Sequence, residues 1–539
     1  MSEMTNVRLP EPTASGRTDG WLEQHSDLAA SVVLTIGLVL RLRAAYGTFL
    51  NPDEALHYFI ANRSSWSQVY QASLTMAHPP LLFFLLYWWR HVGTSEFALR
   101  IPSIIAGTAF CGVFFKWMAY LFGRTPAWIT LILVTFLPPM VALAAEVRQY
   151  ELLLLFAVSA GYFLEKGLAQ NSIRSLFFSF SCLYLAMLSH YSGFLFAAAL
   201  GIYSLWRILS CASRAVWWAW IGGQMGAVGL GVALYVTHIA RIRGTTMAEG
   251  AFETWLYKSY FHQGQNPLIF AAVRSFSVFQ YLFGQRLVGV LMALNFVAGI
   301  ALLLRGTICW PKRGPKSLQV AALLLLPFAI NCGAALRDVY PYGGTRHCVF
   351  LVIFAIAGIA VSLAGLAQQQ VARGIALAVV IVLVCCVFPS TFHPFIARSD
   401  QSETQMAHAI SFVEHQVPAS APILGDYETG MLLGYYLCQR EPISYDGSLE
   451  GFLVFRCGGH RIISTDHDLW FFTPQTFRRQ WSKLMQTGQF RSGEEVWVGQ
   501  VGFNVTLDAD LQRESPDVHL SQTQAFGKNI KFFRVTVGE

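Results

Sequence analysis

The stretch Asn51-Pro-Asp-Glu-Ala-Leu-His-Tyr58 places two adjacent carboxylates, Asp53 and Glu54, directly after the first long apolar segment of the chain. That segment, residues 28–48, is long enough to cross a bilayer, since a spanning helix needs about 20 apolar residues. A carboxylate at membrane depth costs roughly a few kcal/mol and therefore usually has a role. The two acids are thus predicted to stand at a membrane–water boundary, although acidic residues after a span are also commonly just solvated.

The composition is that of a membrane protein with many spans. Of 539 residues, 54% are hydrophobic and 13% are charged, and the mean hydropathy is +0.45, which is too apolar for a water-soluble protein. Residues 391–539 differ from the rest, because they carry 12 Lys/Arg and 17 Asp/Glu against 26 and 14 elsewhere. No basic, aromatic-interleaved patch indicates nucleic-acid binding.

The apolar pattern predicts about eleven transmembrane helices, followed by a small α/β or mainly-β extracytoplasmic domain. We expect a cytoplasmic tail at 1–26, a transmembrane catalytic domain at 27–390 and the soluble domain at 391–539. The predicted spans are 28–48, 101–122, 126–145, 149–165, 174–189, 192–208, 216–238, 286–304, 317–336, 347–367 and 374–390.

The topology depends on residues 80–89, which are intensely apolar but too short to span. Ten residues of helix cover about 15 Å, whereas the hydrocarbon core is about 30 Å thick. We therefore predict an interfacial helix in the first outer loop. The loop Arg305–Lys316, with four basic residues and no acid, favours the cytoplasmic side. Four polar segments then share the outer face: 51–58, 78–80, 146–150 and 340–347. If residues 80–91 did cross, Asp53 and Glu146 would lie on opposite faces.

The motif Glu146-x-Arg148-x-Tyr150 lies between two spans with almost no loop. Glu146 and Tyr150 are four residues apart, so on a helix they share a face. We interpret Glu146 as a second acid that orients an acceptor or the first carboxylate, and Arg148 and Tyr150 as ligands of an anion such as phosphate. A local ion pair at a helix end is the alternative.

The segment Tyr340–His347 opens the tenth predicted span. Its Gly343-Gly344 pair permits a tight turn, and Arg346 and His347 would then begin a helix, where backbone N–H groups favour an anion. An arginine fork also matches phosphate. Arg346 and His347 are therefore predicted to bind an anion such as phosphate, unless Arg346 only snorkels to the interface. Further phosphate candidates are Tyr342 in this loop and Lys258 in the long loop 240–285.

His78 is the most ambiguous of the candidates. Pro79 and Pro80 fix the backbone and start the interfacial helix, so His78 and Pro79 are either acceptor-binding or structural. His78 could also bind a metal, so a divalent cation is possible, although no cofactor is firmly implied. His57 receives no role, and His190 is interpreted as structural.

Two cysteines, Cys438 and Cys457, lie in the predicted soluble domain. They could form a disulfide if that domain is extracytoplasmic. The sequence alone leaves their pairing open.

The order of these motifs resembles a known group. The Asp-Glu pair follows the first span, and His-Pro-Pro-Leu (78–81), Gly93-Thr-Ser-Glu-Phe-Ala-Leu-Arg-Ile-Pro-Ser103 and Glu146-x-Arg-x-Tyr150 come after it. Over roughly residues 28–390 the chain resembles bacterial membrane glycosyltransferases of the GT-C superfamily. These are relatives of protein O-mannosyltransferases and of the transferase that adds aminoarabinose to lipid A.

The resemblance implies a sugar linked to a polyprenyl phosphate as donor and a hydroxyl of a lipid, glycan or protein as acceptor. It also implies inversion, and an extracytoplasmic site in the plasma (inner) membrane. Carried over, Asp53 is the catalytic base, Glu54 its neighbour, Glu146 the second acid and Arg346 a phosphate ligand. A transporter or flippase of a lipid-linked sugar is the main alternative. It predicts broken spans and charges at mid-membrane, whereas the ionisable groups here cluster at span ends. A non-catalytic anchor for the soluble domain would not explain these motifs.

Overall fold

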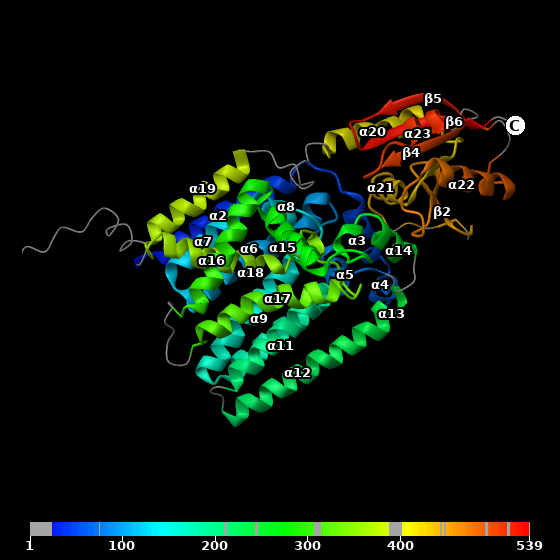
Figure 1. Cartoon of the computed structure of the whole chain (residues 1–539). Coiled ribbons are helices and arrows are strands. Elements are labelled where there is room, and N and C mark those ends of the chain that lie inside the picture. Colours follow the sequence, from blue (N-terminus) through cyan, green and yellow to red (C-terminus); the bar gives the residue numbers. More distant parts are fainter. Residues whose placement is uncertain are drawn as a thin grey trace, which may run out of the picture.

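The chain folds into a helical body with an α/β domain at one end (Figure 1). The computed structural model describes residues 24–74, 76–209, 213–242, 246–306, 314–387, 401–441, 443, 445–446, 449–490, 494–514 and 518–537. The predicted tail therefore lies almost wholly outside the described residues, and so does the predicted domain boundary at residue 390.

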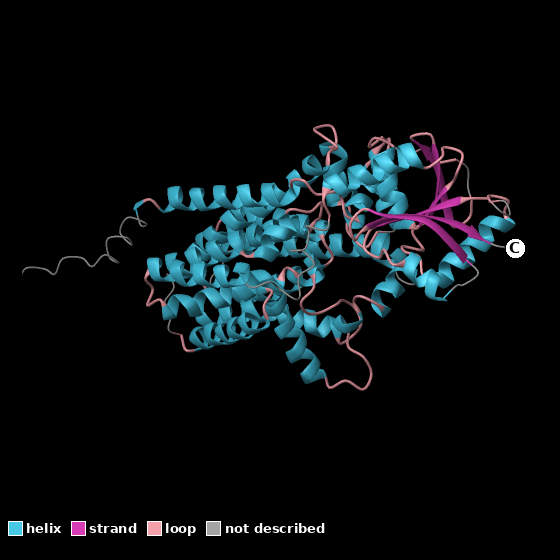
Figure 2. Ribbon diagram, turned by 90° about the horizontal axis from the view of Figure 1, so that it is seen from above, coloured by secondary structure: helices cyan, strands magenta, loops and turns pink. Residues whose placement is uncertain are grey.

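Long apolar helices run side by side through the body, and the sheet lies beyond one of their ends (Figure 2). They are α2 (Ser26–Ala45), α6 (Glu96–Phe122), α7 (Arg124–Phe136), α8 (Pro138–Ala144), α9 (Tyr150–Gln170), α10 (Ile173–Ser189), α11 (Ser192–Ile208), α12 (Arg214–Leu234), α16 (Arg286–Leu304), α17 (Ser317–Ala335), α18 (Leu351–Leu366) and α19 (Val371–Val387). A π-helical turn (Tyr235–Ile239) and α13 (Ala240–Ile242) extend α12.

The predicted count of eleven spans is not confirmed. Among the described residues, six helices are long and apolar enough to cross a membrane, or seven if α7 and α8 form one bent span. Helices α10, α11, α18 and α19 coincide with predicted spans but have only 16 or 17 described residues each, short of the usual length.

The predicted span 126–145 is broken by a 60° bend between α7 and α8. Leu137 at the break has a ψ of 126°, outside the helical region. The following residue is Pro138, whose ring disfavours helical backbone at the residue before it. The bend is therefore a direct consequence of the Leu137-Pro138-Pro139 sequence.

Further helices, most of them short, fill the two long loops at the domain end of the body. Between α2 and α6 they are α3 (Pro52–Ala61), α4 (Trp66–Ser73) and α5 (Leu81–Trp89). Between α13 and α16 they are α14 (Thr246–Glu253), the 3₁₀ turn Tyr257–Ser259 and α15 (Pro267–Phe283); the 3₁₀ turn Arg346–Cys348 precedes α18.

The α3–α5 segment starts and finishes on the same face of the body. Ahead of α3, Leu50 N donates to Tyr436 Oη at 3.0 Å. Beyond α5, Tyr435 Oη donates to the Thr94 carbonyl at 2.6 Å. Because Tyr435 and Tyr436 are neighbours, α5 returns to the side it started from. This agrees with the prediction that residues 80–91 do not cross.

The C-terminal domain is α/β rather than mainly β. Its six-stranded sheet has the order β2-β3-β1-β4-β6-β5, with β1 parallel to β3 and β4 and the other pairs antiparallel. The strands are β1 (Ile423–Gly425), β2 (Phe452–Cys457), β3 (His460–Thr465), β4 (Val496–Val501), β5 (Val518–Ala525) and β6 (Ile530–Val537). The helices are α20 (Glu403–Gln416), α21 (Tyr427–Leu437), α22 (Pro474–Gln486) and α23 (Leu507–Glu514).

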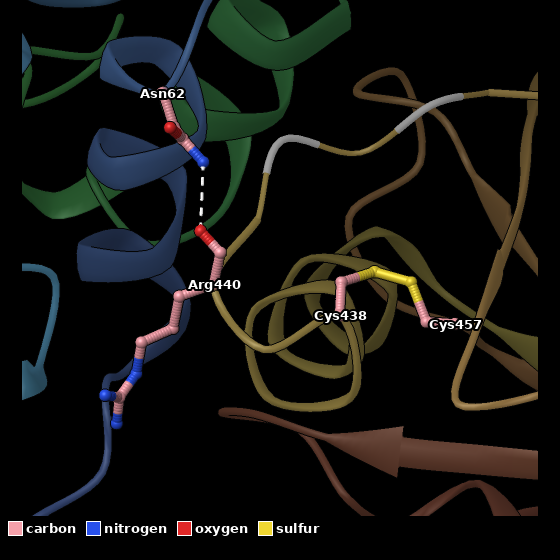
Figure 3. Close-up of a disulfide and its surroundings, with 4 residues drawn as sticks. All are labelled: Asn62, Cys438, Arg440 and Cys457. Carbon is pink, nitrogen blue, oxygen red and sulfur yellow. Dashed lines mark hydrogen bonds between the residues drawn. A yellow bond between two sulfur atoms is a disulfide. The ribbon is translucent and has the colours of Figure 1, made fainter.

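This domain is docked firmly on α3 and α5. Buried side chains of α3 and α5 share one hydrophobic core with α20, α21 and the sheet. Arg440 Nη2 lies 2.9 Å from Glu96 Oε2, and the Arg440 carbonyl accepts hydrogen bonds from Tyr58 Oη and Asn62 Nδ2. A disulfide joins Cys438 to Cys457 beside this contact, as Figure 3 shows.

The position of Arg90 at the end of α5 makes the topology testable. Arg90 Nη1 donates to Asn62 Oδ1 at 3.0 Å, on the face that carries the C-terminal domain. We expect Arg90→Cys to react with a membrane-impermeant maleimide from the same side as Arg513→Cys, an exposed position of that domain. Arg124→Cys, between α6 and α7, should react from the other side. The topology would be contradicted if Arg90→Cys and Arg124→Cys both reacted from the same side of the membrane, each above the labelling of the unmodified chain.

Candidate active site

The first turn of α3 sends the two adjacent acids in different directions. Asn51 caps this helix: Glu54 N donates to Asn51 Oδ1, and Asn51 N donates to Glu54 Oε2, both at 3.0 Å. Pro52 follows at the first helical position, where its missing N–H costs nothing. This cap fixes the Glu54 side chain against the helical body, and the Asp53 side chain leaves α3 in a different direction.

Glu54 is completely buried in an ion pair with Arg100. Arg100 Nε and Nη2 donate to Glu54 Oε1 and Oε2, each at 2.8 Å, and both side chains are 0% exposed. Val147 N also donates to Glu54 Oε1 at 2.9 Å. Glu54 was predicted as a catalytic residue, but this enclosure gives it a positioning role instead, because no substrate can reach its carboxylate.

Arg100 extends this network to the end of the first span. Its Nη1 and Nη2 donate to the carbonyls of Ala45, Thr48 and Phe49 at 2.9–3.0 Å. The guanidinium therefore fixes the connection from α2 to α3. Arg100 lies within the quoted motif 93–103 but was not predicted as a site residue. A charged residue inside an otherwise apolar helix was the feature of the sequence that could have indicated a buried ion pair.

Asp53 is held between two arginines from distant parts of the chain. Arg148 Nη2 and Arg346 Nη2 each lie 2.7 Å from Asp53 Oδ2, and the Asp53 side chain is 15% exposed. Burial by itself raises the pKa of Asp53, but the charges of Arg148 and Arg346 outweigh it and hold the pKa well below its usual range. Asp53 is therefore an ionised, partly accessible carboxylate.

The segment Glu146–Tyr150 differs from its prediction. Residues 146–149 form a turn between α8 and α9, so Glu146 and Tyr150 do not share a helical face. Glu146 is buried, and Arg148 rather than Glu146 reaches Asp53. Ser103 Oγ donates to the Arg148 carbonyl at 3.0 Å, and the Arg148 guanidinium lies 5.6 Å from the centre of the Tyr150 ring. The turn thus aims Arg148 at Asp53.

The loop that carries Arg346 lies directly against α15. Gly343 has a φ of +124°, and Gly344 N donates to Ser277 Oγ at 2.8 Å. A Cβ atom on Gly344 would lie 2.1 Å from the Ser277 carbonyl oxygen, so only glycine fits there. Arg346 and His347 begin a three-residue 3₁₀ turn, not the predicted α-helix start. The side chains, rather than a helix N-terminus, provide the positive charge.

Two predicted phosphate ligands do not join this cluster. Tyr342 is fully buried, its Oη is 2.5 Å from Ser275 Oγ, and its N donates to the Ser259 carbonyl at 2.8 Å. Tyr342 therefore ties two loops together. Lys258, in the neighbouring 3₁₀ turn, is exposed.

Four histidines stack in a column beside Asp53. The ring centres of His57 and His78 are 5.6 Å apart, those of His78 and His190 are 5.7 Å apart, and those of His190 and His347 are 6.0 Å apart. His57 Nδ1 lies 2.5 Å from the Asp53 carbonyl. Only His78 and His347 were predicted site residues; the spacing of four between Asp53 and His57 was the signal for His57.

The column is neutral at pH 7. Burial, followed by the charge of Arg148, lowers the pKa of His57 to about 4. Burial, followed by the charge of Arg346, lowers that of His347 to about 3. Burial lowers the pKa values of His78 and His190 well below their usual range. Within the described ranges, no three His, Cys, Asp or Glu side chains converge as metal ligands. The possible divalent cation stays a prediction.

Comparisons with known proteins agree with this architecture. Residues 77–238 match the family model described as dolichyl-phosphate-mannose-protein mannosyltransferase. No curated protein sequence matches the chain. Among solved structures, ArnT from Cupriavidus metallidurans in the apo state is similar, with a TM-score of 0.54, 14% identity, and 96% of this chain and 98% of that chain covered.

The same ArnT bound to undecaprenyl phosphate gives a TM-score of 0.53 at 14% identity, covering 94% of this chain and 97% of that chain. At this identity the likeness is one of fold. Together with the family match, it confirms the predicted resemblance to GT-C superfamily membrane glycosyltransferases. Asp53 and Arg346 lie outside the matched range 77–238, so their roles depend on the geometry.

The buried pair Glu54–Arg100 predicts a large stability effect. In Glu54→Gln, Arg100 would keep its charge without a carboxylate, which costs about 3–5 kcal/mol at a fully buried site. Glu96→Gln is the matched control, because it lies on the same helix as Arg100 but pairs with Arg440, which is 36% exposed. Thermal unfolding in detergent should show the larger fall in midpoint for Glu54→Gln. Equal falls in the two variants would contradict the positioning role.

The histidine column predicts a loss of stability in acid. Between pH 6.5 and about 4 the unfolded chain binds protons at these histidines while the folded chain does not, so stability falls as pH falls, by roughly 1.4 kcal/mol per unit of pKa difference. His57→Gln keeps a donor for the Asp53 carbonyl and should flatten the dependence of the unfolding midpoint on pH. His415→Gln, at an exposed position, should not. If the unfolding midpoint fell with pH as steeply in His57→Gln as in the unmodified chain, His57 would not be held neutral in the folded protein.

Proposed function

We propose that the protein is a glycosyltransferase that moves a sugar from a polyprenyl phosphate to a hydroxyl acceptor, with inversion, at the extracytoplasmic membrane face. The observation that carries the proposal is the carboxylate of Asp53 held between Arg148 and Arg346. This cluster lies on the domain side of a helical body whose fold and family match are those of GT-C transferases.

The arginines suit the phosphate of the donor. A guanidinium binds phosphate oxygens through paired N–H donors. Arg346 is 29% exposed, so it can reach an incoming anion, whereas Arg148 is fixed behind it. The solved ArnT complex holds undecaprenyl phosphate, and a donor of the same chemical class is proposed here. A site at the membrane–water boundary is also accessible both to a donor whose long apolar chain stays in the bilayer and to an acceptor that comes from the water.

The reaction needs a base and a phosphate site but no general acid. The acceptor oxygen bonds to the anomeric carbon, and its proton passes to the Asp53 carboxylate. The bond from the anomeric carbon to the phosphate oxygen breaks, and its electron pair leaves with the phosphate. Arg148 and Arg346 stabilise the charge that develops there. The sugar passes through an oxocarbenium-like transition state, as in glycoside hydrolysis.

The contacts also imply that donor binding activates the base. With both arginines on its Oδ2 atom, Asp53 is a weak base because its pKa is low. A donor phosphate competes for the same guanidinium groups. As they turn to the phosphate, the pKa of Asp53 rises toward its ordinary value. Asp53 thus becomes a competent base only when a donor is present.

The remaining candidates have lesser roles in this account. Glu146 is the second acid, buried two residues before Arg148 in the same turn. Tyr150 supports the Arg148 guanidinium, and His78 and His347 line the site in the neutral form. Pro79 has the structural role.

Two observations favour the extracytoplasmic orientation. The disulfide Cys438–Cys457 lies in the C-terminal domain, and disulfides persist in oxidising compartments. The basic loop Arg305–Lys316 favours the cytoplasm for the opposite end of the body. A transporter of a lipid-linked sugar remains the alternative, and the α7–α8 break is a feature of transporters. However, the Asp53 cluster lies at span ends rather than at mid-membrane, which favours transfer.

Two substitutions test the assigned roles. Asp53→Asn should lower transfer of labelled sugar from polyprenyl phosphate by about 10²–10⁴-fold, since it removes the base. Arg346→Ala should raise the apparent KM for the donor by roughly tenfold or more, since it removes a charged hydrogen bond. Lys258→Ala is the matched control and should change the KM less. Near-normal turnover in Asp53→Asn would remove the central assignment, and an unchanged KM in Arg346→Ala would move the phosphate site.

A further inference from the structure

A cavity of about 230 Å³ lies between α3–α4 and the C-terminal domain. Asp53, Arg148 and Arg346 are not among the residues that line it. Residues of both domains line it, among them Leu56, Phe59, Arg63, Tyr427, Ser464 and Asp466. The docking of the soluble domain therefore creates a space that neither part has alone.

Buried polar atoms without partners lie in the wall of this cavity. Ser464 is 0% exposed, and its Oγ has no hydrogen-bond partner among the described residues. The buried Nε of Arg63, on the opposite wall, also has none. A buried polar group without a partner costs about 1–3 kcal/mol, so such groups usually indicate a missing ligand or water.

The lining fits one sugar ring. Phe59, Tyr427 and Tyr445 offer apolar aromatic faces, while Arg63 and Asp466 offer a planar donor and a carboxylate acceptor. A pyranose has the matching chemistry: C–H groups on its faces and hydroxyls around its rim. A lipid chain would leave the polar groups unsatisfied. The volume is also below the ~300–1,000 Å³ of pockets for drug-sized ligands, and so it suits a single ring.

The cavity is placed where an acceptor would extend from the reaction site. Leu56 and Phe59 follow Asp53 on α3, and Arg63 lies just beyond the end of this helix, so Leu56 lies one turn beyond the proposed base. We propose that this cavity binds one sugar ring of the acceptor, next to the ring or hydroxyl that reacts at Asp53. The proposal rests on glycosyl transfer as the function, and it gives the C-terminal domain a part in choosing the acceptor.

Binding can be tested without turnover. The full-length protein in nanodiscs is titrated with D-glucose, D-mannose, D-galactose and N-acetyl-D-glucosamine, one at a time, by saturation-transfer NMR. At least one sugar should bind. Arg63→Met should weaken its binding by roughly tenfold, the loss expected for a charged hydrogen bond. Ala72→Phe, which fills the cavity from α4, should abolish it.

Three further variants separate this site from the others. Asp53→Asn should keep sugar binding although transfer is lost, so failure of the proposed function and failure of this inference give different results. Arg513→Met, at an exposed arginine of the C-terminal domain, is the matched control and should bind normally. Ser464→Ala, which leaves the cavity walls in place, should weaken binding even if Ala72→Phe does not fold. Absence of binding for all four sugars, or binding that survives Arg63→Met and Ser464→Ala, would overturn the proposal.

Discussion

The ion pair between Glu54 and Arg100 is the constraint on which the reaction face depends. It joins a helix at the membrane boundary to a buried position inside α6, and Arg100 also binds the backbone between α2 and α3. Burying two charges is expensive unless each is fully hydrogen-bonded, and here six backbone or side-chain groups also bond to the pair. The intact pair therefore adds little net stability, although removal of one partner is costly. Its main effect is to fix the position and rotation of α3, and with them the direction of the Asp53 side chain.

Once α3 is fixed, two other segments complete the site. The α8–α9 turn presents Arg148, and the glycine loop packed on α15 presents Arg346. Both arginines meet one carboxylate oxygen, which keeps Asp53 ionised, and burial together with the nearby positive charges keeps the neighbouring histidines neutral. In the proposed function, these two guanidinium groups bind the phosphate of the donor. The C-terminal domain packs on the same helix, so the candidate active site and this domain share α3.

The sequence predicted most of what depends on local pattern. Apolar length predicted the helical body, and the short run that ends at Trp89 predicted a helix that does not cross, which agrees with the contacts on both sides of α5. The acids at a span end predicted Asp53 as a site residue. Contacts between distant segments could not be predicted in this way. Nothing in the order of residues shows that Glu54 turns inward to Arg100, or that His57 and His190 join His78 and His347 in one column. Glu146 and Tyr150 do not share a helical face because residues 146–149 form a turn, and Tyr342 is buried, with its Oη hydrogen-bonded to Ser275 Oγ. Helices of 16 or 17 residues are close to the shortest length that can span a bilayer. Hydropathy alone therefore does not decide whether they are counted as spans.

The central claim is that the arginines around Asp53 bind the phosphate of a lipid-linked sugar. Mass spectrometry of lipid copurified with the Asp53→Asn protein tests it most directly, because this variant frees both arginines from their carboxylate and stops turnover. The account predicts a polyprenyl phosphate that carries a sugar, enriched in Asp53→Asn and depleted when Arg346→Ala is added. Bulk phospholipid alone, at the same level in both preparations, would contradict it.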